Sequence, residues 1–444
     1  MSSRPAQKNV PRHVPTGKFY SSLNRRGAGG AALRRKNFTF ASLRLYHHFM
    51  NERTRIILNA GKEQSLLRFH PWVFSGAIKK MQGEPQDGDT VEVYSSRNEF
   101  LGVGHYQKGS ITVRLLAFND LEIDQNFWKQ KLPQAYDYRQ ALGFVNNPNT
   151  NVYRLVFAEG DGLPGLIIDV YGDTAVIQAH SLGMYRSRTE IARALHEIYQ
   201  GKLRAVYDKS AETLHLQQTE APLNSYLIGT GDEAHVVTEN GHSFYVDWVT
   251  GQKTGFFIDQ RENRELLAKY TPGKSVLNTF CYTGGFSVYA LNAGAALVHS
   301  VDSSKKAIAL TDRNAALNNA GERHASFAVD TFSFFKQNPQ PYDVIILDPP
   351  AFAKHHNVRH NAIMGYKRLN AEALRQIKPG GILFTFSCSQ AVDKYLFNST
   401  IMAAAIEAGR QVKIMHHLSQ PADHPVSVYH PEGEYLKGLV LFVE

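Results

Sequence analysis

Short apolar runs alternate with helix-forming stretches over residues 243–444. The runs are rich in β-branched and aromatic residues, and five of them lie at residues 275–280, 298–301, 325–329, 344–347 and 382–386. Continuous apolar runs of this length are typical of parallel strands that are buried on both faces. With helices between them, they predict an α/β fold, a Rossmann-like doubly wound sheet. Two later runs, at residues 411–415 and 438–443, predict an antiparallel pair at the edge of this sheet.

The pattern changes toward the N-terminus, where residues 54–118 contain short runs separated by turn residues. The runs lie at residues 55–58, 90–94 and 111–116, and they predict a small β-rich module. Within it, Trp72 has Arg68, Lys79 and Lys80 nearby in the sequence. An exposed aromatic ring can stack on a base while cations meet phosphates, so we expect these four residues to bind RNA. The alternative is that Trp72 fills the core of a β-barrel.

Between these regions, residues 124–240 mix strand and helix signals. Helices are expected at residues 124–142 and 185–199, and strands at residues 154–158, 165–170, 174–178, 205–207 and 234–238. This order of elements predicts a compact α+β middle domain. Asp161 and Asp169 lie beside predicted turns, and we expect them to form those turns rather than to bind a ligand.

The formal net charge of +9 is concentrated at one end of the chain. Residues 1–50 hold ten Lys and Arg and no acidic residue, which leaves 39 basic and 40 acidic residues in residues 51–444. Net charge therefore does not argue for RNA binding by the folded body. We expect the leader to be disordered. It is a transit-like peptide, an RNA-touching arm or sequence upstream of the true start, and we favour the last because strand-like patterning begins directly after Met50.

The chain contains two cysteines, Cys281 and Cys388, which lie 107 residues apart. This number excludes a disulfide framework and a four-cysteine zinc site, and it favours a reducing, cytoplasmic setting. Adjacent histidines occur at residues 355–356 and 416–417, but neighbouring residues of a strand point to opposite faces, so we expect no metal site. The leader has no apolar stretch long enough to span a bilayer, and we expect no membrane partner.

A glycine-containing loop, Cys281-Tyr282-Thr283-Gly284-Gly285, follows the first strand of the predicted sheet. Glycines there permit a tight turn and a close approach of the backbone to a ligand at a helix N-terminus. The loop lacks the G-x-G-x-x-G fingerprint of dinucleotide cofactors. Asp302 ends the second strand, where a carboxylate can accept hydrogen bonds from both ribose hydroxyls, and Asp330 ends the third, where it can meet an adenine amino group. A nucleoside without a pyrophosphate indicates S-adenosylmethionine.

An acid and a thiol end the next two strands. Asp348 is followed by Pro349-Pro350, and Cys388 lies between two serines. Because parallel strands open at the same edge of a sheet, both side chains should face one crevice, an arrangement suited to nucleophilic attack on a pyrimidine ring. We expect Ser389 to cap a helix that begins near Ala391, whose dipole would lower the pKa of the Cys388 thiol. For Cys281 we expect a structural or pocket-lining role.

Several motifs together resemble the rRNA large-subunit methyltransferase I family. They are residues 251–264, the loop at 281–286, Leu347-Asp348-Pro349-Pro350 with the residues up to 354, residues 365–367, and Ser387-Cys388-Ser389. Residues 70–76, which begin His70-Pro71-Trp72, resemble that family's RNA-binding PUA module. The resemblance implies a class I methyltransferase domain over residues 243–444 that uses S-adenosylmethionine to form 5-methylcytosine in large-subunit (23S) rRNA. It also implies a homodimer, and a lid over the cofactor that contains Gln252, Asp259 and Arg261.

Carbon 5 of cytosine is too weak a nucleophile to take a methyl group unaided. Addition of the Cys388 thiolate at carbon 6 would activate it, and Asp348 would protonate or hydrogen-bond nitrogen 3. The acceptor of the carbon-5 proton stays open between Asp348, Lys354 and water. Three other functions fit the sequence: methylation of an exocyclic amine, methylation of guanine at nitrogen 7, which needs no cysteine, and a non-catalytic RNA-binding assembly factor.

Overall fold

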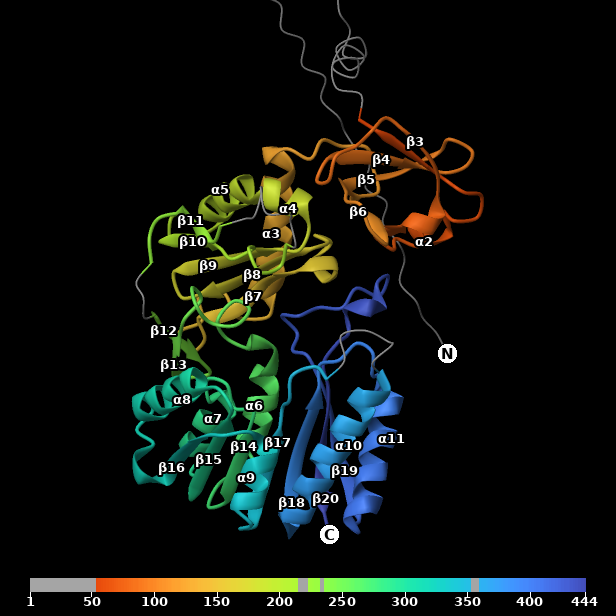
Figure 1. Ribbon diagram of the computed structural model, residues 1–444. Coiled ribbons are helices and arrows are strands. Elements are labelled where there is room, and N and C mark those ends of the chain that lie inside the picture. The colour runs from red at the N-terminus through yellow and green to blue at the C-terminus, as the bar shows by residue number, and fades with distance from the viewer. Residues whose placement is uncertain (1–52, 215–222, 232–234, 353–358) are drawn as a thin grey trace, which may run out of the picture. The chain divides into compact units, whose positions relative to one another are not determined.

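The computed structural model describes residues 53–214, 223–231, 235–352 and 359–444. Residues 53–444 form one compact unit, and its described part contains four sheets (Figure 1). The basic leader, Lys354 and the histidine pair at 355–356 lie outside the described residues. None of the helices in the described part of the chain combines the length and the apolar character needed to cross a bilayer.

The N-terminal module is a six-stranded sheet with the strand order β2-β6-β5-β4-β1-β3. Ile56, Val91 and Val113 belong to its core. The sequence did not predict β2, β3 or β5. In β5, a Cβ atom at Gly104 would lie 2.1 Å from the Arg114 carbonyl oxygen on β6, so the two strands approach too closely for a side chain. The elements are β1 (Arg55–Leu58), α2 (Gln64–Leu67), β2 (Trp72–Phe74), β3 (Ile78–Gln82), β4 (Thr90–Tyr94), β5 (Phe100–Tyr106) and β6 (Ile111–Ala117).

The middle region is a five-stranded sheet with the order β11-β10-β9-β8-β7, and α3 and α5 share a core with it. Asp124 caps α3 by accepting hydrogen bonds from the backbone of Asn126 and Phe127. The expected helix at 185–199 is divided into two helices that meet at Ser187. The elements are α3 (Gln125–Ala141), β7 (Val152–Phe157), β8 (Leu166–Tyr171), β9 (Thr174–Ala179), α4 (Leu182–Arg186), α5 (Arg188–Ile198), β10 (Ala205–Asp208) and β11 (Ser225–Ile228).

A second apolar cluster joins this sheet to the rest of the chain. Tyr171 and Val176 pack with Phe244 and Tyr289. Phe244 lies on β13 (His242–Val246), which pairs in an antiparallel hairpin with β12 (His235–Glu239). Asp169, expected in a turn, lies instead inside β8, where it is fully buried and bridged by Arg154 through two hydrogen bonds of 2.8 Å. The expectation of a turn was wrong, because the Arg154 guanidinium offsets the free-energy cost of burying a carboxylate inside the strand.

The C-terminal region is a seven-stranded sheet with the order β16-β15-β14-β17-β18-β20-β19. β14 to β18 are mutually parallel, and β20 runs antiparallel to both β18 and β19. The doubly wound sheet and its antiparallel edge pair are thus confirmed. The strands are β14 (Ser275–Thr279), β15 (Leu297–Asp302), β16 (His324–Ala328), β17 (Tyr342–Leu347), β18 (Ile377–Ser387), β19 (Val412–Ser419) and β20 (Lys437–Val443).

Helices cover both faces of this sheet (Figure 1). Neighbouring strand residues point to opposite faces: Val344 packs with the core that includes α6 and α7, and Ile345 with the core that includes α10 and α11. α11 begins at Lys394 with Asp393 as its cap, not near Ala391. The helices are α6 (Arg261–Ala268), α7 (Gly285–Asn292), α8 (Lys305–Leu317), α9 (Thr331–Gln337), α10 (Arg359–Gln376) and α11 (Lys394–Ala408).

Candidate active site

A cavity of about 270 Å³ opens where β14, β15, β17 and β18 end. Chemically active side chains from all four strand ends line it, among them Tyr282, Asp302, Asp348 and Cys388. The segment before α6 supplies a further wall, with Gln252, Lys253, Asp259 and Gln260. The edge of a parallel sheet predicted from sequence thus does bring the acid and the thiol to one cavity.

The loop after β14 follows a strained backbone path. Phe280 and Tyr282 have φ of 55° and 46°, and Gly284 has φ of 75° at the start of α7. A Cβ atom at Gly284 would lie 2.7 Å from Cγ2 of Thr311, so glycine is needed there for both conformation and space. Side chains of α8 hold this path: Thr311 donates to the Tyr282 carbonyl and Asn314 to the Thr283 carbonyl, both at 2.8 Å.

Asp302 connects this loop with the next strand end. Its Oδ2 accepts a hydrogen bond from the backbone of Tyr282 at 3.0 Å, and its Oδ1 accepts one from the backbone of Ser304 at 2.9 Å. These donors fix the carboxylate against the cavity while each oxygen keeps a lone pair for a further donor. The arrangement fits the two hydroxyls of a ribose.

Asp348 lies at the cavity wall, where Nε2 of Gln260 donates to its Oδ2 at 3.1 Å. Burial and, second, the charge of Asp259 raise the pKa of Asp348 to about 7. Asn263 donates to Oε1 of Gln260 at 2.6 Å, which orients the amide with its NH₂ group toward Asp348. Near neutral pH this carboxyl group can therefore both accept and donate a proton.

Cys388 follows β18 and faces the same cavity. Burial and, second, the charge of Asp348 raise the pKa of its thiol, whereas the nearby Lys253 opposes that shift. The expected lowering by a helix dipole was wrong, because α11 begins beyond Ser389 and Asp393 is its cap. The turn is supported from β20 instead, where Nζ of Lys437 donates to the Ser389 carbonyl at 2.6 Å.

The connection between β19 and β20, residues 420–436, contributes to the site without having been predicted to do so. Leu436 lines the cavity, and Oη of Tyr435 donates to Oδ2 of Asp259 at 2.5 Å. Burial acts to raise the pKa of Asp259, but Lys253, His424 and Tyr435 outweigh it, and the net pKa is lowered. Lys253 and Gln260 lie in the segment that the resemblance gave as a lid, whereas Tyr435 lies in none of the motifs.

Three predicted cofactor residues lie outside the set that lines the cavity. Gly284 shapes the turn, and Asp330 is exposed and caps α9 by accepting from the Ser333 backbone at 3.0 Å. Arg261 is buried and pairs with Asp423 at 2.9 Å and with Glu239 at 3.5 Å. Asp330 as a cofactor ligand stays a prediction, and for Arg261 the structure gives a structural role beside the cavity. Cys281 is buried in the loop, where burial raises its pKa to about 12.

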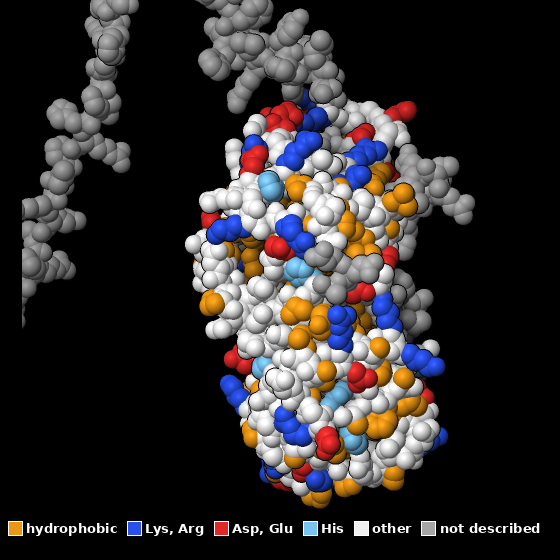
Figure 2. Space-filling view, turned by 90° about the vertical axis from the view of Figure 1, so that its left-hand side faces the viewer, with side chains coloured by type: hydrophobic (Ala, Val, Ile, Leu, Met, Phe, Trp, Pro, Cys, Tyr) orange, Lys and Arg blue, Asp and Glu red, His pale blue; other side chains and the backbone are white. Residues whose placement is uncertain are grey.

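The four predicted RNA-binding residues differ in exposure. Arg68, Lys79 and Lys80 are exposed. Trp72 is half-buried, its Nε1 donates to Oε1 of Glu159 at 2.9 Å, and its ring meets that of His430 edge-on at 4.3 Å. It therefore belongs neither to the core of the module nor to a free stacking surface. On the face shown in Figure 2, basic and acidic side chains are interspersed.

Comparison with known proteins gives matches along most of the chain. Residues 56–118 match the PUA-like domain family, and residues 192–432 match the S-adenosylmethionine-dependent methyltransferase family. The ribosomal RNA large subunit methyltransferase I of Aeromonas hydrophila is 41% identical over 394 residues, which cover 87% of this chain and 98% of that protein. The protein of the same name from Aeromonas salmonicida is 40% identical over 393 residues, with the same coverage.

Two solved structures are similar over the same share of the chain. A SAM-dependent methyltransferase from Streptococcus mutans has 25% sequence identity and a TM-score of 0.76, and the match covers 87% of this chain and 99% of that one. A methyltransferase crystallised in complex with SAH has 26% identity and a TM-score of 0.76, with the same coverage. These matches show a methyltransferase fold and a family that uses S-adenosylmethionine.

Proposed function

The chain belongs to the ribosomal RNA large subunit methyltransferase I family, whose enzymes use S-adenosylmethionine, and we propose that it methylates carbon 5 of a cytosine in large-subunit rRNA. The family indicated by the sequence motifs is thereby confirmed. The observation that carries the finer proposal is that Asp348 and Cys388 line one cavity together with Tyr282 and Asp302, the residues expected to bind the nucleoside.

The residues present fit S-adenosylmethionine. Asp302 would accept hydrogen bonds from the ribose. The loop residues Tyr282, Thr283 and Gly285 would contact the nucleoside, since all four residues line the cavity. The bound cofactor would supply an electrophilic methyl group. Asp259 and Gln252, from the segment before α6, also line the cavity, and the hydroxyl of Tyr282 accepts a hydrogen bond from the backbone of Gln252 at 3.0 Å, which ties the loop to that segment.

Cys388 and Asp348 together produce the reactive thiolate. Burial and the charge of Asp348 raise the pKa of the Cys388 thiol, and burial and the charge of Asp259 raise that of Asp348 to about 7, so at rest the thiol holds its proton and the carboxyl group is close to half-protonated. Transfer of the thiol proton to the Asp348 carboxylate yields a thiolate and a carboxylic acid in one step. The acid then donates to nitrogen 3 of cytosine, which draws electrons from the ring and favours attack at carbon 6.

The bonds formed and broken balance over the cycle. The Cys388 sulfur would bond to carbon 6. The electrons of the carbon 5–carbon 6 double bond would then form the bond between carbon 5 and the methyl carbon, while the bond between that methyl carbon and the cofactor sulfur breaks. A base then takes the carbon-5 proton, the double bond returns and the thiolate is expelled. Asp348, which is a carboxylate once its proton has passed to nitrogen 3, and a water in the cavity are the candidate bases, together with Lys354 outside the described residues. The nitrogen-3 proton then returns to the expelled thiolate, and the carbon-5 proton passes from the base to solvent.

The test is mass spectrometry of nucleosides from unmodified large-subunit rRNA that has been incubated with S-adenosylmethionine and the enzyme. We expect 5-methylcytidine with the intact protein, none with Cys388→Ala, and retained product with Cys281→Ser, the matched change at the second cysteine of the cavity.

Substrate RNA that carries 5-fluorocytosine gives a second readout. Fluorine at carbon 5 cannot be removed as a proton, so the adduct should persist as a covalent protein–RNA complex on a denaturing gel, and only when Cys388 is present. Formation of 7-methylguanosine, or activity that is indifferent to Cys388, would contradict the proposal and favour the guanine nitrogen-7 alternative.

A further inference from the structure

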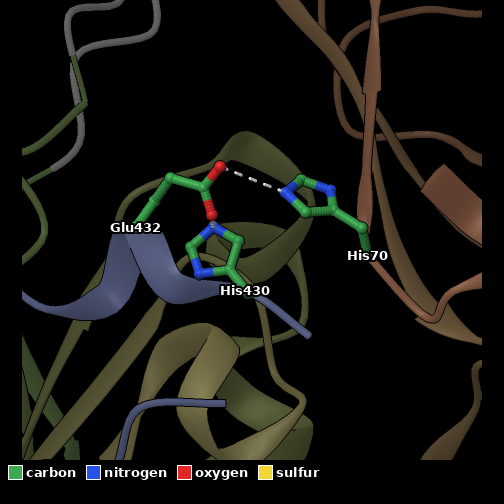
Figure 3. A group of neighbouring side chains, drawn as sticks. All are labelled: His70, His430 and Glu432. Carbon is green, nitrogen blue, oxygen red and sulfur yellow. Dashed lines mark ion pairs between the residues drawn. The ribbon is translucent and has the colours of Figure 1, made fainter. Parts of the chain in front are cut away.

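Two imidazole rings and a carboxylate from distant parts of the sequence meet outside the active site. His70 belongs to the N-terminal module, whereas His430 and Glu432 belong to the β19–β20 connection (Figure 3). The carboxylate of Glu432 lies between the rings: Oε1 is 3.5 Å from Nε2 of His70, and Oε2 is 3.7 Å from Nε2 of His430. The available ligand atoms of the three residues all lie within 4.8 Å of one another.

His430 is the residue that points to a ligand. It is 3% exposed, and neither of its ring nitrogens has a hydrogen-bond partner among the described residues. Its ring is held by aromatic neighbours, Trp72 at 4.3 Å and His70 at 5.2 Å between ring centroids. Buried imidazoles in folded proteins are nearly always paired, so a ring with two unsatisfied nitrogens, one of which faces the Glu432 carboxylate, needs an explanation.

The spacing suits a small divalent cation. Nitrogen and oxygen ligands at about 2.0–2.2 Å from a tetrahedral zinc ion lie about 3.3–3.5 Å from each other, close to the two distances from Glu432. Two imidazoles and one carboxylate are a ligand set that such ions prefer, with water in the remaining position. The side chain of Glu432 is 50% exposed, which leaves an entry path from solvent.

One existing contact must change on binding. Nδ1 of His70 accepts a hydrogen bond from the backbone of Trp72, at the long distance of 3.3 Å. Coordination through Nε2 would place the proton of the neutral ring on Nδ1 and replace that weak bond by a metal–nitrogen bond.

We propose that His70, His430 and Glu432 form a binding site for Zn²⁺ that ties the N-terminal module to the β19–β20 connection. This departs from the sequence prediction of no metal, which considered only adjacent histidines. The connection also carries Tyr435 and Leu436 of the active site, so the bound ion would stabilise one wall of that cavity from outside it. The inference is independent of the proposed methylation chemistry.

The experiment uses the full chain, stripped with a chelator and titrated with ZnCl₂ by calorimetry, with thermal unfolding measured in parallel. We expect about one equivalent of zinc to bind with an affinity that falls by about 10- to 100-fold in Glu432→Gln and in His430→Phe. Zinc should raise the melting temperature of the wild type and leave that of Glu432→Gln unchanged. Glu432→Gln alters an exposed, isosteric group and should fold normally, and His430→Phe keeps the ring packing on Trp72.

A matched control separates this site from incidental binding elsewhere. His417→Phe changes an exposed histidine of the edge strand β19 and should bind zinc as the wild type does. Zinc binding that survives in both Glu432→Gln and His430→Phe, or a wild type that retains no zinc after gel filtration, would overturn the proposal.

Discussion

The carboxyl edge of the C-terminal sheet and the β19–β20 connection build the same cavity in opposite ways. At the sheet edge, each reactive or ligand-binding residue ends its own strand or follows it directly: Asp302 ends β15, and Asp348 and Cys388 follow β17 and β18. In the connection, each residue acts through partners far away in the sequence: Asp423 pairs with Arg261, and Tyr435 with Asp259. The reactive groups are thus encoded locally, whereas the groups that hold them are supplied by the tertiary fold.

Asp423 shows how much of the structure one residue of the connection can organise. Its Oδ2 accepts from the backbone of Arg154 at 3.0 Å and from Arg261 at 2.9 Å, and its carbonyl oxygen accepts from Arg139 at 2.7 Å. Although burial acts to raise it, the neighbouring charges of Arg261 and His424 hold the pKa of Asp423 far below its usual range. The carboxylate is therefore charged at every pH at which the protein is used.

After the loss of product expected for Cys388→Ala, the largest effect at the sheet edge is expected for Asp348→Asn. The amide can neither take the Cys388 proton nor supply one to the base, so kcat should fall by about 10²- to 10⁴-fold in a single-turnover methylation assay. Asp343→Asn is the matched control, since Asp343 lies at the opposite end of the same strand and pairs with Lys378 there. Equal loss in both variants would contradict a proton-transfer role for Asp348.

The largest effect expected in the connection is on stability. Asp423→Asn would leave the buried Arg261 guanidinium without the charge of this carboxylate, and the free energy of unfolding in urea should fall by about 3–5 kcal/mol. Asp393→Asn changes an exposed acid that caps α11, and it should stay within about 0.5 kcal/mol because asparagine caps equally well. A loss below 1 kcal/mol for Asp423→Asn would contradict a stabilising role for the connection.

The pH dependence of stability should distinguish the two regions. Between its ordinary pKa of 3.8 and about 7, Asp348 holds a proton in the folded state that the unfolded chain releases. Its contribution to the free energy of unfolding therefore decreases as the pH rises from about 4 to about 7. Asp348→Asn lacks this loss. The melting temperature of the variant minus that of the wild type should therefore increase by a few degrees between pH 5 and pH 8. A pH-independent difference would contradict the raised pKa.

The smallest effect expected is that of Tyr435→Phe. Removal of the hydroxyl takes one hydrogen bond from the Asp259 carboxylate, worth about 1–2 kcal/mol, so the Kd for S-adenosylmethionine should rise by about 5- to 20-fold. Tyr395→Phe, on α11 and 87% exposed, should leave that affinity unchanged. An unchanged affinity in Tyr435→Phe would mean that the connection does not support the cofactor wall.

The sequence predicts the sheet edge well because apolar runs identify buried strands and the next residue then stands at the opening. It fails at β5, where Gly102 and Gly104 weaken the strand pattern and serve close strand contact, and at α11, where Asp393 competes with Ser389 as a helix cap. It also fails for Arg261 and Asp423. Nothing in a single sequence says that these two residues are partners, because their pairing depends on how the middle and C-terminal regions pack.

The backbone path of the loop after β14 bears on how stable the protein can become. Phe280 and Tyr282 hold positive φ angles that cost non-glycine residues about 1–2 kcal/mol each. Glycine at either position would relieve that strain, although Phe280 also packs against the core of the sheet. Either change would remove a side chain that lines the cavity, so at both positions relief of the backbone and catalytic turnover would be selected against each other.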